Sequence, residues 1–277
     1  MTVRSQPLAG GIAFITGGAR GLGNAVAVSF AKDGATGIAL VDIQDEQTFL
    51  EGRTAVEKYN CKCITIRADV TKEEEVERAV RTAVAAFGRI DYAANFAGIA
   101  GPFGKTWETD YDAWNRPQQI NAGGTFLCMK HQLKQMMKQD PIKGENGRVS
   151  QRGSIVNCAS INSMLSVAGA RSYTASKHAV VGMTKAAALE AREHGIRVNA
   201  VSPGFIMTQL LGNDLAAAVA SGKIESPWKP QEERQGRKAS PDEIGDVVVL
   251  LSTPRMSLVN GHNLVIDGGF SINGGNN

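Results

Sequence analysis

Short apolar segments alternate with longer segments of helical pattern along nearly the whole chain, and this alternation constrains the fold most strongly. The apolar segments are almost continuously hydrophobic, as expected for strands that are buried on both faces. They lie at Ile12–Thr16, Gly37–Asp42, Cys63–Ala68, Ile90–Asn95, Ser154–Asn157, Arg197–Val201 and Leu264–Asp267. The predicted helices cover Leu22–Asp33, Glu46–Lys58, Glu73–Phe87, about Trp107–Lys138, Ser172–His194 and Pro241–Leu251. The alternation predicts βαβ units on a parallel sheet, with helices on both faces.

Residues 1–277 contain no visible linker or internal repeat, so we expect a single α/β domain. Two segments do not fit the alternation. The polar stretch 139–153 is predicted to be an exposed loop, and residues 208–238 are long and mixed in character. A long excursion inside a compact domain is often a lid, so we predict that 208–238 cover the substrate. Thr71 with Glu74, and Ser240 with Glu243, each fit a capping box at a helix start.

Composition and charge argue against several classes of protein. The chain carries 30 Lys and Arg against 27 Asp and Glu, and it has no basic run, so we expect no nucleic-acid partner. No stretch approaches about 18 apolar residues, so we expect no membrane span, and we see no signal-peptide pattern. The cysteines at 61, 63, 128 and 158 face no second Cys/His cluster. Free thiols, no metal site and a cytoplasmic location are therefore expected.

A glycine-rich turn follows the first predicted strand and leads directly into a helix. The turn, Thr16–Gly23, has glycines at 17, 18, 21 and 23. Such glycines let the backbone approach a pyrophosphate, and the N-terminus of the next helix favours its negative charge. Glycines also form tight turns that bind nothing. However, a strand, such a turn and a helix in this order are the context in which a dinucleotide is bound.

Asp42 ends the second predicted strand and bears on the choice of cofactor. A carboxylate at this point can accept hydrogen bonds from the adenosine ribose hydroxyls. It would repel the 2′-phosphate of NADP, whereas Arg20 could bind that phosphate. We give Asp42 more weight because it should lie directly at the ribose, so the sequence favours NAD. The alternative is that Asp42 is an ordinary turn residue at the end of a strand.

Ser160, Tyr173 and Lys177 form a second group of candidate residues. Tyr173 and Lys177 are four residues apart, so they share one face of a helix. A neighbouring ammonium favours the phenolate, and this turns a phenol with a pKa near 10 into a usable acid or base. Ser160 follows the fifth predicted strand and could polarise a carbonyl oxygen, and Asn121 is a fourth candidate. Taken alone, the Tyr–Lys pair also fits an ordinary amphipathic helix.

Several apolar residues are candidates for substrate contacts. Trp228 lies between two prolines in the candidate lid and could contact substrate or belong to the core. Trp107 and Trp114 could also be core residues. The expected substrate contacts are Ser160, Met164, Tyr173, Phe205, Leu210 and Trp228, and Phe103 and Leu211 would line the mouth of the site. These residues favour an apolar small molecule.

From about Gly11 to Gly269 the sequence resembles the short-chain dehydrogenase/reductase family. The motifs that carry the resemblance are Thr16–Gly23, Asp69-Val70, Ser160 with Tyr173–Lys177, Arg197–Gly204 and Asp267–Gly269. The resemblance implies a Rossmann-type, doubly wound, seven-stranded parallel sheet. It also implies a catalytic tetrad of Asn121, Ser160, Tyr173 and Lys177, in which a water bridges Asn121 and Lys177. The resemblance also implies a homotetramer or homodimer. The local sequence is similar to that of fungal members that modify secondary metabolites.

The expected cofactor contacts combine the turn, Asp42 and positions matched through the resemblance. They are Gly17, Arg20, Gly21, Leu22, Gly23, Asp42, Ile43, Asp69, Val70, Asn95, Ala97, Gly98, Tyr173, Lys177, Pro203, Gly204, Ile206 and Thr208.

Two positions depart from the family pattern. The family's Asn-Asn-Ala-Gly motif reads Asn95-Phe96-Ala97-Gly98 here, which places in question a hydrogen bond that steadies the central sheet. Pro117 stands inside the long predicted helix, four residues before Asn121. Because proline in a helix costs about 3 kcal/mol, we predict a kink or break near 113–117 that could displace Asn121.

Three functional hypotheses follow. The leading one is NAD(H)-dependent hydride transfer between the cofactor and a secondary alcohol or ketone, with Tyr173 as acid/base. A second is an enzyme of the same fold that isomerises, dehydrates or cyclises a natural product. A third is a protein that binds the nicotinamide cofactor without catalysis, which the Ser160–Tyr173–Lys177 set argues against.

Overall fold

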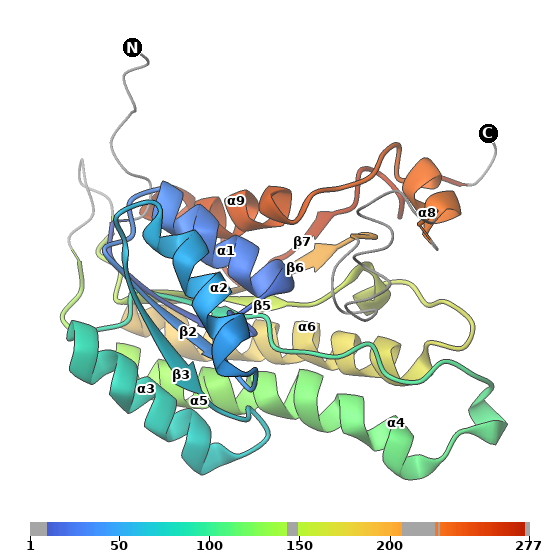
Figure 1. The fold of residues 1–277 in the computed structure, drawn as a ribbon, viewed down its shortest axis with the longest axis horizontal. Coiled ribbons are helices and arrows are strands. Elements are labelled where there is room, and N and C mark those ends of the chain that lie inside the picture. Colours follow the sequence, from blue (N-terminus) through green and yellow to red (C-terminus); the bar gives the residue numbers. More distant parts are fainter. Residues whose placement is uncertain (1–9, 143–148, 207–224, 227, 275–277) are drawn as a thin grey trace.

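The computed structural model describes residues 10–142, 149–206, 225–226 and 228–274. Within these ranges the chain forms one seven-stranded parallel sheet with the order β3-β2-β1-β4-β5-β6-β7, which confirms the predicted fold class (Figure 1). The strands are β1 Ile12–Thr16, β2 Gly37–Asp42, β3 Lys62–Arg67, β4 Tyr92–Asn95, β5 Gly153–Cys158, β6 Ile196–Pro203 and β7 Asn263–Ile266. The first two have the predicted bounds, and the others differ by one or two residues at either end.

Helices cover both faces of the sheet, as expected for right-handed crossovers (Figure 1). On one face lie α1 Gly21–Lys32, α2 Glu46–Glu57 and α9 Pro241–Ser252. On the other lie α3 Glu73–Phe87, α5 Thr125–Met136 and α6 Arg171–Ala191. Short helices complete the described chain: α4 Tyr111–Pro117, α8 Lys229–Arg234, η1 Thr106–Glu108, η4 Ile161–Ser163, η5 Arg192–His194 and η7 Pro254–Met256.

The two-sided burial explains why the strands read as continuous apolar runs. In β1, Ala13 and Ile15 pack toward α1 and α9, whereas Phe14 between them packs toward α3 and α5. Every residue of β1 is buried. Successive strand residues point to opposite faces, so a strand covered on both sides must be apolar at every position.

The helix predicted over 107–138 is divided. Its α-helical part ends at Pro117, at the edge of the predicted break, and continues as a π-helical segment, η2 Gln118–Gly124, before α5 begins. Pro117 has no N–H for the carbonyl of Ala113, so regular bonding cannot run through it. Trp107, which the sequence left open as a core residue, does not belong to the core, because it is 81% exposed in η1.

The two predicted capping boxes fare differently. At α9 the Glu243 side chain accepts the Ser240 N–H at 2.8 Å, and the box is present. At α3 the helix begins at Glu73, and it is Glu75 rather than Glu74 that accepts a backbone N–H, from Asp69 at 2.8 Å. The predicted box at Thr71 and Glu74 is therefore wrong. In the part of the predicted loop that is described, Ile142 and Gln151 pair across an antiparallel bridge.

Candidate active site

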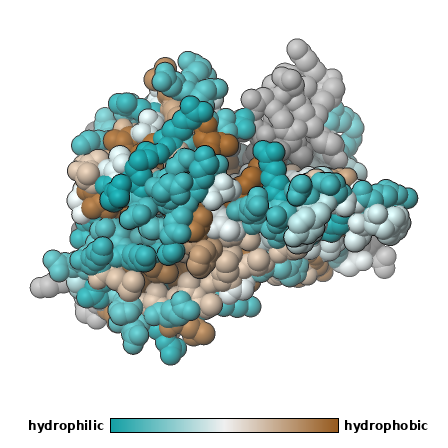
Figure 2. All heavy atoms as spheres, turned by 90° about the horizontal axis from the view of Figure 1, so that it is seen from below, coloured by the Kyte–Doolittle hydropathy of each residue, from teal (hydrophilic) through white to brown (hydrophobic). Residues whose placement is uncertain are grey.

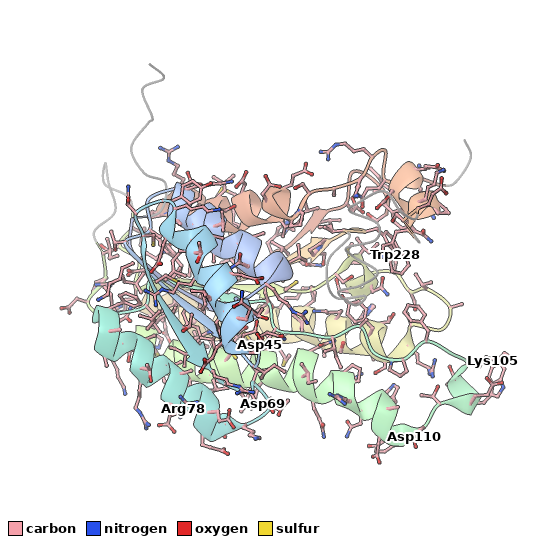
Figure 3. The ribbon with its side chains drawn as sticks, in the orientation of Figure 1. Asp45, Asp69, Arg78, Lys105, Asp110 and Trp228 are labelled. Atoms are coloured by element: carbon pink, nitrogen blue, oxygen red, sulfur yellow. The ribbon has the colours of Figure 1, made fainter. Side chains whose placement is uncertain are left out.

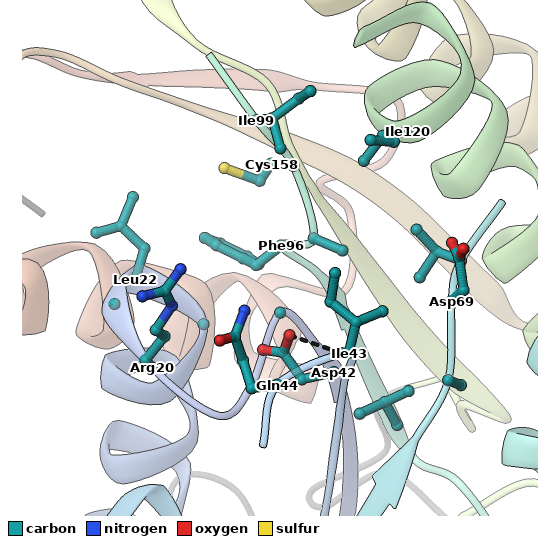
Figure 4. A pocket seen from close by; sticks show the side chains of 18 of the residues that line it. Arg20, Leu22, Asp42, Ile43, Gln44, Asp69, Phe96, Ile99, Ile120 and Cys158 are labelled. Carbon is teal, nitrogen blue, oxygen red and sulfur yellow. Dashed lines mark hydrogen bonds between the residues drawn. The ribbon is translucent and has the colours of Figure 1, made fainter. Parts of the chain in front are cut away.

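The strand order reverses between β1 and β4, and a cavity lies at the carboxyl ends of the strands near this point. The cavity measures about 340 Å³ (Figure 4). Its lining brings together many of the predicted cofactor residues: Gly17, Arg20, Gly21, Leu22, Gly23, Asp42, Ile43, Asp69, Val70, Ala97, Gly98, Tyr173 and Lys177. Asn95, Pro203, Gly204 and Ile206 are described but do not line it, and Thr208 lies outside the described residues.

The glycine turn requires glycine for steric reasons. A Cβ at Gly23 would lie 2.1 Å from the carbonyl oxygen of Gly17, so no side chain fits there. Gly17 has a φ of 65°, and a Cβ on it would lie 2.8 Å from the backbone of Phe96 and Ala97. Helix α1 starts at Gly21 with no acidic residue in its first turn. The close backbone approach and the free first turn of the helix fit a bound pyrophosphate.

Asp42 is tied to this turn by both carboxylate oxygens. One oxygen accepts the Ala19 N–H at 3.1 Å, and the other accepts the Ile43 N–H at 2.8 Å (Figure 4). Arg20 and Gln44 lie beside Asp42 at the same end of the cavity (Figure 4). Since each carboxylate oxygen can accept two hydrogen bonds, Asp42 keeps acceptor capacity for hydroxyl groups in the cavity.

Asp69 and Val70 close the cavity at the end of β3. The Asp69 carboxylate accepts hydrogen bonds from the N–H of Thr71 at 2.9 Å and from its hydroxyl at 2.8 Å. The Asp69 N–H donates to Glu75, and this bond together with Lys72 lowers the pKa of the Glu75 carboxyl. Val70 packs against Gly124, where a Cβ would lie 2.6 Å from its side chain. These contacts fix the short turn that leads into α3.

Tyr173 and Lys177 lie on α6 and face the same cavity as the glycine turn. The Lys177 ammonium lies 5.5 Å from the centre of the Tyr173 ring and donates to the Cys158 carbonyl at 2.7 Å. Lys177 is only 4% exposed. Among the residues that the structure describes, no protein group hydrogen-bonds the Tyr173 hydroxyl. A half-buried phenol and a buried ammonium thus face the same cavity, and no described residue occupies the phenol hydroxyl.

Ser160 lies two residues beyond β5 but does not line the cavity. Its side chain accepts the Asn162 N–H at 3.2 Å and caps η4, and the residue is 8% exposed. Its hydroxyl hydrogen remains available as a donor, because in this bond the oxygen only accepts.

Asn121 lies in the π-helical segment and is fully buried. Its amide donates to the Ile99 carbonyl and to the Ser176 hydroxyl, both at 3.0 Å, and accepts the Ile99 N–H at 2.9 Å. Its backbone carbonyl accepts the Thr125 hydroxyl at 2.7 Å. Asn121 is therefore held beside the residue that precedes Lys177, but it does not line the cavity.

The hydrogen bonds that steady the central sheet are retained despite Phe96. Asn95 donates to Asn157 on the neighbouring strand at 2.9 Å and exchanges two hydrogen bonds with Gln132 of α5, at 2.8 and 3.0 Å. Asn157 continues the network to Thr184 of α6 at 3.0 Å. Phe96 lines the cavity and packs against the core. The first of the family's two asparagines is thus sufficient to join the strands here.

The predicted substrate residues are only partly brought together. The Phe205 ring contacts the rings of Trp228 and Phe270, with centroid distances of 5.3 and 5.0 Å. Met164 is 43% exposed after η4, and Leu210 lies outside the described residues. In Figure 3, Trp228 lies well away from Asp45 and Asp69, at the other side of the strand ends.

Sequence reasoning missed several residues that line the cavity. They are Val41, Gln44, Ala68, Phe96, Ile99, Arg116, Ile120 and Cys158. Cys158 is the last residue of β5, so its position at the carboxyl edge could have been inferred from the strand pattern. Burial raises the pKa of its thiol, with a smaller opposing effect of Lys177. The position of Arg116 at the cavity could not be inferred, because Arg116 belongs to no motif and reaches the cavity from α4, which is remote in sequence from the glycine turn.

The described residues contain no helix that could cross a membrane and no group of three metal-binding side chains. These two results cover the described ranges only.

Comparisons with known proteins show the family to which the chain belongs. The family model described as enoyl-(acyl carrier protein) reductase matches residues 17–271. The short-chain dehydrogenase anuF of Penicillium roqueforti is 37% identical over 273 residues, which cover 95% of this chain and 96% of that protein. The (+)-borneol dehydrogenase 2 of Salvia officinalis is 34% identical, with 95% and 90% covered. The solved structure of levodione reductase superposes with a TM-score of 0.81 at 32% identity, with 96% and 99% covered. This chain belongs to the short-chain dehydrogenase/reductase family, whose members are oxidoreductases that use a nicotinamide cofactor.

Proposed function

We propose that the protein transfers a hydride between NAD(H) and a secondary alcohol or ketone of an apolar small molecule, with Tyr173 as acid/base. One observation carries the proposal: Tyr173 and Lys177 line the same cavity as the glycine turn and Asp42. This supports an acid/base role for Tyr173 beside a site suited to a dinucleotide. The relatives named as dehydrogenases and a reductase support the same chemistry.

A bound nicotinamide ring would supply or accept the hydride. In the direction of reduction, the Tyr173 hydroxyl donates a proton to the substrate oxygen, and in oxidation the Tyr173 phenolate removes that proton. The Lys177 ammonium, 5.5 Å from the centre of the Tyr173 ring, stabilises the phenolate that results. Ser160 donates a hydrogen bond to the same substrate oxygen. Asn121 completes the proposed tetrad, and its carbonyl holds a water that passes protons to Lys177.

Asp42 favours NAD over NADP. Its carboxylate is fixed by the N–H groups of Ala19 and Ile43 at the cofactor end of the cavity. A fixed negative charge can accept hydrogen bonds from ribose hydroxyls and repels a phosphate in the same place. Arg20 lines the same end of the cavity and would favour a phosphate, but the fixed Asp42 carboxylate lies directly at the expected ribose position.

The substrate is proposed to lie between Ser160, Tyr173 and an apolar wall formed by Met164, Phe205, Leu210 and Trp228. Residues 208–238 would cover it as a lid. Phe205 and Trp228 already contact each other in the described part of this wall. Similarity to anuF and other fungal short-chain dehydrogenases supports a role in secondary metabolism.

We also propose that the protein acts in the cytoplasm as a homotetramer or homodimer through α5 and α6. Phe126 on α5 and Leu189 on α6 are exposed, although both are large and hydrophobic. Seen from below, where α3, α4 and α5 lie in Figure 1, hydrophobic residues gather in a band beside hydrophilic ones (Figure 2). A second copy of the chain packed against α5 and α6 would cover Phe126 and Leu189.

The test is to incubate the purified protein with NADH and a panel of cyclic and long-chain ketones, and with NAD⁺ and the matching alcohols. We expect loss or gain of the reduced-nicotinamide absorbance in proportion to product. Product formed with only catalytic amounts of cofactor would instead favour isomerisation, dehydration or cyclisation. Tight cofactor binding without any product would favour a non-catalytic protein.

A further inference from the structure

Gln235 lies just after α8, yet it holds the backbone that follows β6, thirty residues earlier. Its side-chain oxygen accepts the Phe205 N–H at 2.9 Å, and its side-chain nitrogen donates to the Phe205 carbonyl at 3.3 Å. The same nitrogen donates to the Arg237 carbonyl at 3.2 Å. Gln235 is 4% exposed, so these bonds form away from water. The side-chain amide of Gln235 therefore forms hydrogen bonds with both the N–H and the carbonyl of Phe205.

Two glycines make this pairing possible. A Cβ at Gly204 would lie 2.2 Å from the Gln235 side-chain oxygen, and a Cβ at Gly268 would lie 2.3 Å from the Gln235 carbonyl oxygen. Gly268 also has a φ of 58°, which favours glycine. Three segments that are remote in sequence therefore meet at Gln235: the ends of β6 and β7 and the turn after α8.

Aromatic contacts surround the same point. The Phe205 ring packs between Trp228 and Phe270, and the Arg234 guanidinium lies 4.4 Å from the centre of the Phe270 ring. Arg234 also donates to the Asn273 carbonyl at 2.6 Å. The backbone held by Gln235 thus belongs to a packed cluster.

The place of this cluster relative to the cavity suggests what the pairing does. The glycine turn, Asp42 and Asp69 follow β1, β2 and β3, so the adenosine half of a dinucleotide belongs on that side. The other mononucleotide half then extends over β4, β5 and β6. The segment 203–206 continues β6 on that second side.

On the basis of the proposed function, we propose that Gln235 is a positioning residue for the nicotinamide half of the cofactor. It fixes the Gly204–Ile206 backbone at the carboxyl end of β6 and joins that backbone to α8. Loss of the pairing frees the Phe205 peptide to move. Binding of the nicotinamide half weakens, whereas the adenosine half, held on the other side of the sheet, is unaffected.

The chain contains a matched control at the opposite edge of the sheet. Gln139 accepts the Ile90 N–H at 2.8 Å and donates to the Ile90 carbonyl at 2.9 Å, which is the same pairing just before β4. Gln139 is 8% exposed. Replacing either glutamine by methionine removes the same bonds from a buried site, but only Gln235 lies at the cofactor edge.

The experiment is titration calorimetry of full-length protein with NAD⁺ and with ADP-ribose, which lacks the nicotinamide. For Gln235→Met we expect the Kd of NAD⁺ to rise about tenfold, as loss of the two buried hydrogen bonds to Phe205 allows, while the Kd of ADP-ribose is unchanged. For Gln139→Met both constants should stay at the wild-type values. Gln235→Glu keeps an acceptor for the Phe205 N–H but sets its second oxygen against the Phe205 and Arg237 carbonyls, so it should also weaken NAD⁺ and not ADP-ribose. It serves as the test if the methionine variant does not fold.

Equal weakening of NAD⁺ and ADP-ribose in the Gln235 variants, or no weakening of either, would overturn the assignment. So would a Gln139 variant that shows the same selective loss. Wild-type protein that binds neither NAD⁺ nor ADP-ribose would overturn the proposed function itself and the role of Gln235 with it.

Discussion

The two edges of the sheet use buried polar side chains in different ways. At the amino edge, Asp91 accepts the Ile12 N–H at 2.9 Å and Gln139 pairs with Ile90. Arg197 donates to four backbone carbonyls there, those of Leu251, Ser252, Thr253 and Val259. At the carboxyl edge, Tyr173 and Asp42 line a cavity instead. The side chains of Asp91, Gln139 and Arg197 are satisfied within the protein at one edge, whereas Tyr173 and Asp42 leave capacity for a ligand at the other.

The comparison teaches that burial of a polar residue does not by itself identify a functional site. Arg197 is 6% exposed and Lys177 is 4% exposed, so the two cations are equally buried. Burial lowers the pKa of Arg197 to about 10, yet its donors are occupied by carbonyls. The Lys177 ammonium donates one hydrogen bond to the Cys158 carbonyl, and Lys177 also lines the cavity. What distinguishes them is where their remaining hydrogen-bonding capacity points.

The largest effect should come from Tyr173→Phe at the carboxyl edge. We expect kcat/KM to fall about a hundredfold to ten-thousandfold, the contribution typical of a general acid, while the Kd of NAD⁺ is unchanged. Steady-state kinetics and titration calorimetry measure the two quantities. Tyr59→Phe, an exposed tyrosine after α2 at the amino edge, is the control and should keep full activity. A Tyr173→Phe enzyme of undiminished rate would remove Tyr173 from the mechanism.

Arg197→Met should affect stability instead of chemistry. It leaves several buried carbonyls without donors, so we expect the free energy of unfolding to fall by about 3 to 5 kcal/mol, with kcat of the folded protein unchanged. Urea unfolding followed by circular dichroism measures the loss. Arg192→Met, an exposed arginine nearby, should cost little. If Arg197→Met lowered kcat without lowering stability, the division between the edges would be wrong.

Asp42→Ser should change cofactor preference. Removing the charge ends the repulsion of a 2′-phosphate and weakens ribose binding, so the ratio of kcat/KM for NAD⁺ to that for NADP⁺ should fall about tenfold or more. Kinetics with each cofactor measure the ratio. Asp42→Asn keeps acceptor capacity without the charge and should give an intermediate ratio. An unchanged ratio in both variants would show that Asp42 does not select the cofactor.

The smallest effect concerns pH and Glu243, at the start of α9. Hydrogen bonds from Arg237 and from the Ser240 N–H lower the pKa of this carboxyl to about 2 from its ordinary 4.5. Its ionised form is favoured in the folded state, so its contribution is present above about pH 4.5 and is lost as the pH falls towards 2. Because Glu243 is partly exposed, Glu243→Gln should cost less than about 1 kcal/mol at neutral pH. Urea unfolding at neutral pH and near pH 3 should show a smaller difference between variant and wild type at the lower pH, and a constant difference would contradict the assignment.

Much of the fold was predictable because its signal is local. A strand buried on both faces must be apolar throughout, so β1 and β2 could be bounded from the sequence. Pro117 predicted a break because proline lacks an N–H, but the π-helical segment after it could not be foreseen. Whether Trp107 is buried could not be predicted, because the type of a residue alone does not determine whether other parts of the chain pack over it.

The candidate site was predictable where a motif is contiguous. The glycine turn and the Tyr173–Lys177 pair are each read from one short segment, and both line the cavity. Gln235 could not be found in that way. Its partner lies thirty positions earlier, and two glycines that admit it look like ordinary turn residues. Contacts between remote segments follow from packing, which a single sequence does not display.

The central claim is that the carboxyl edge carries out hydride transfer with Tyr173 supplying the proton. The direct measurement is reduction, in ordinary water, of a ketone found in the substrate panel, with NADH that carries deuterium at the transferred position of its nicotinamide ring. We predict one deuterium on the carbinol carbon of each product molecule, equal to the NADH consumed, and a hydroxyl hydrogen from solvent. A product without deuterium, formed while NADH is not consumed, would contradict the claim.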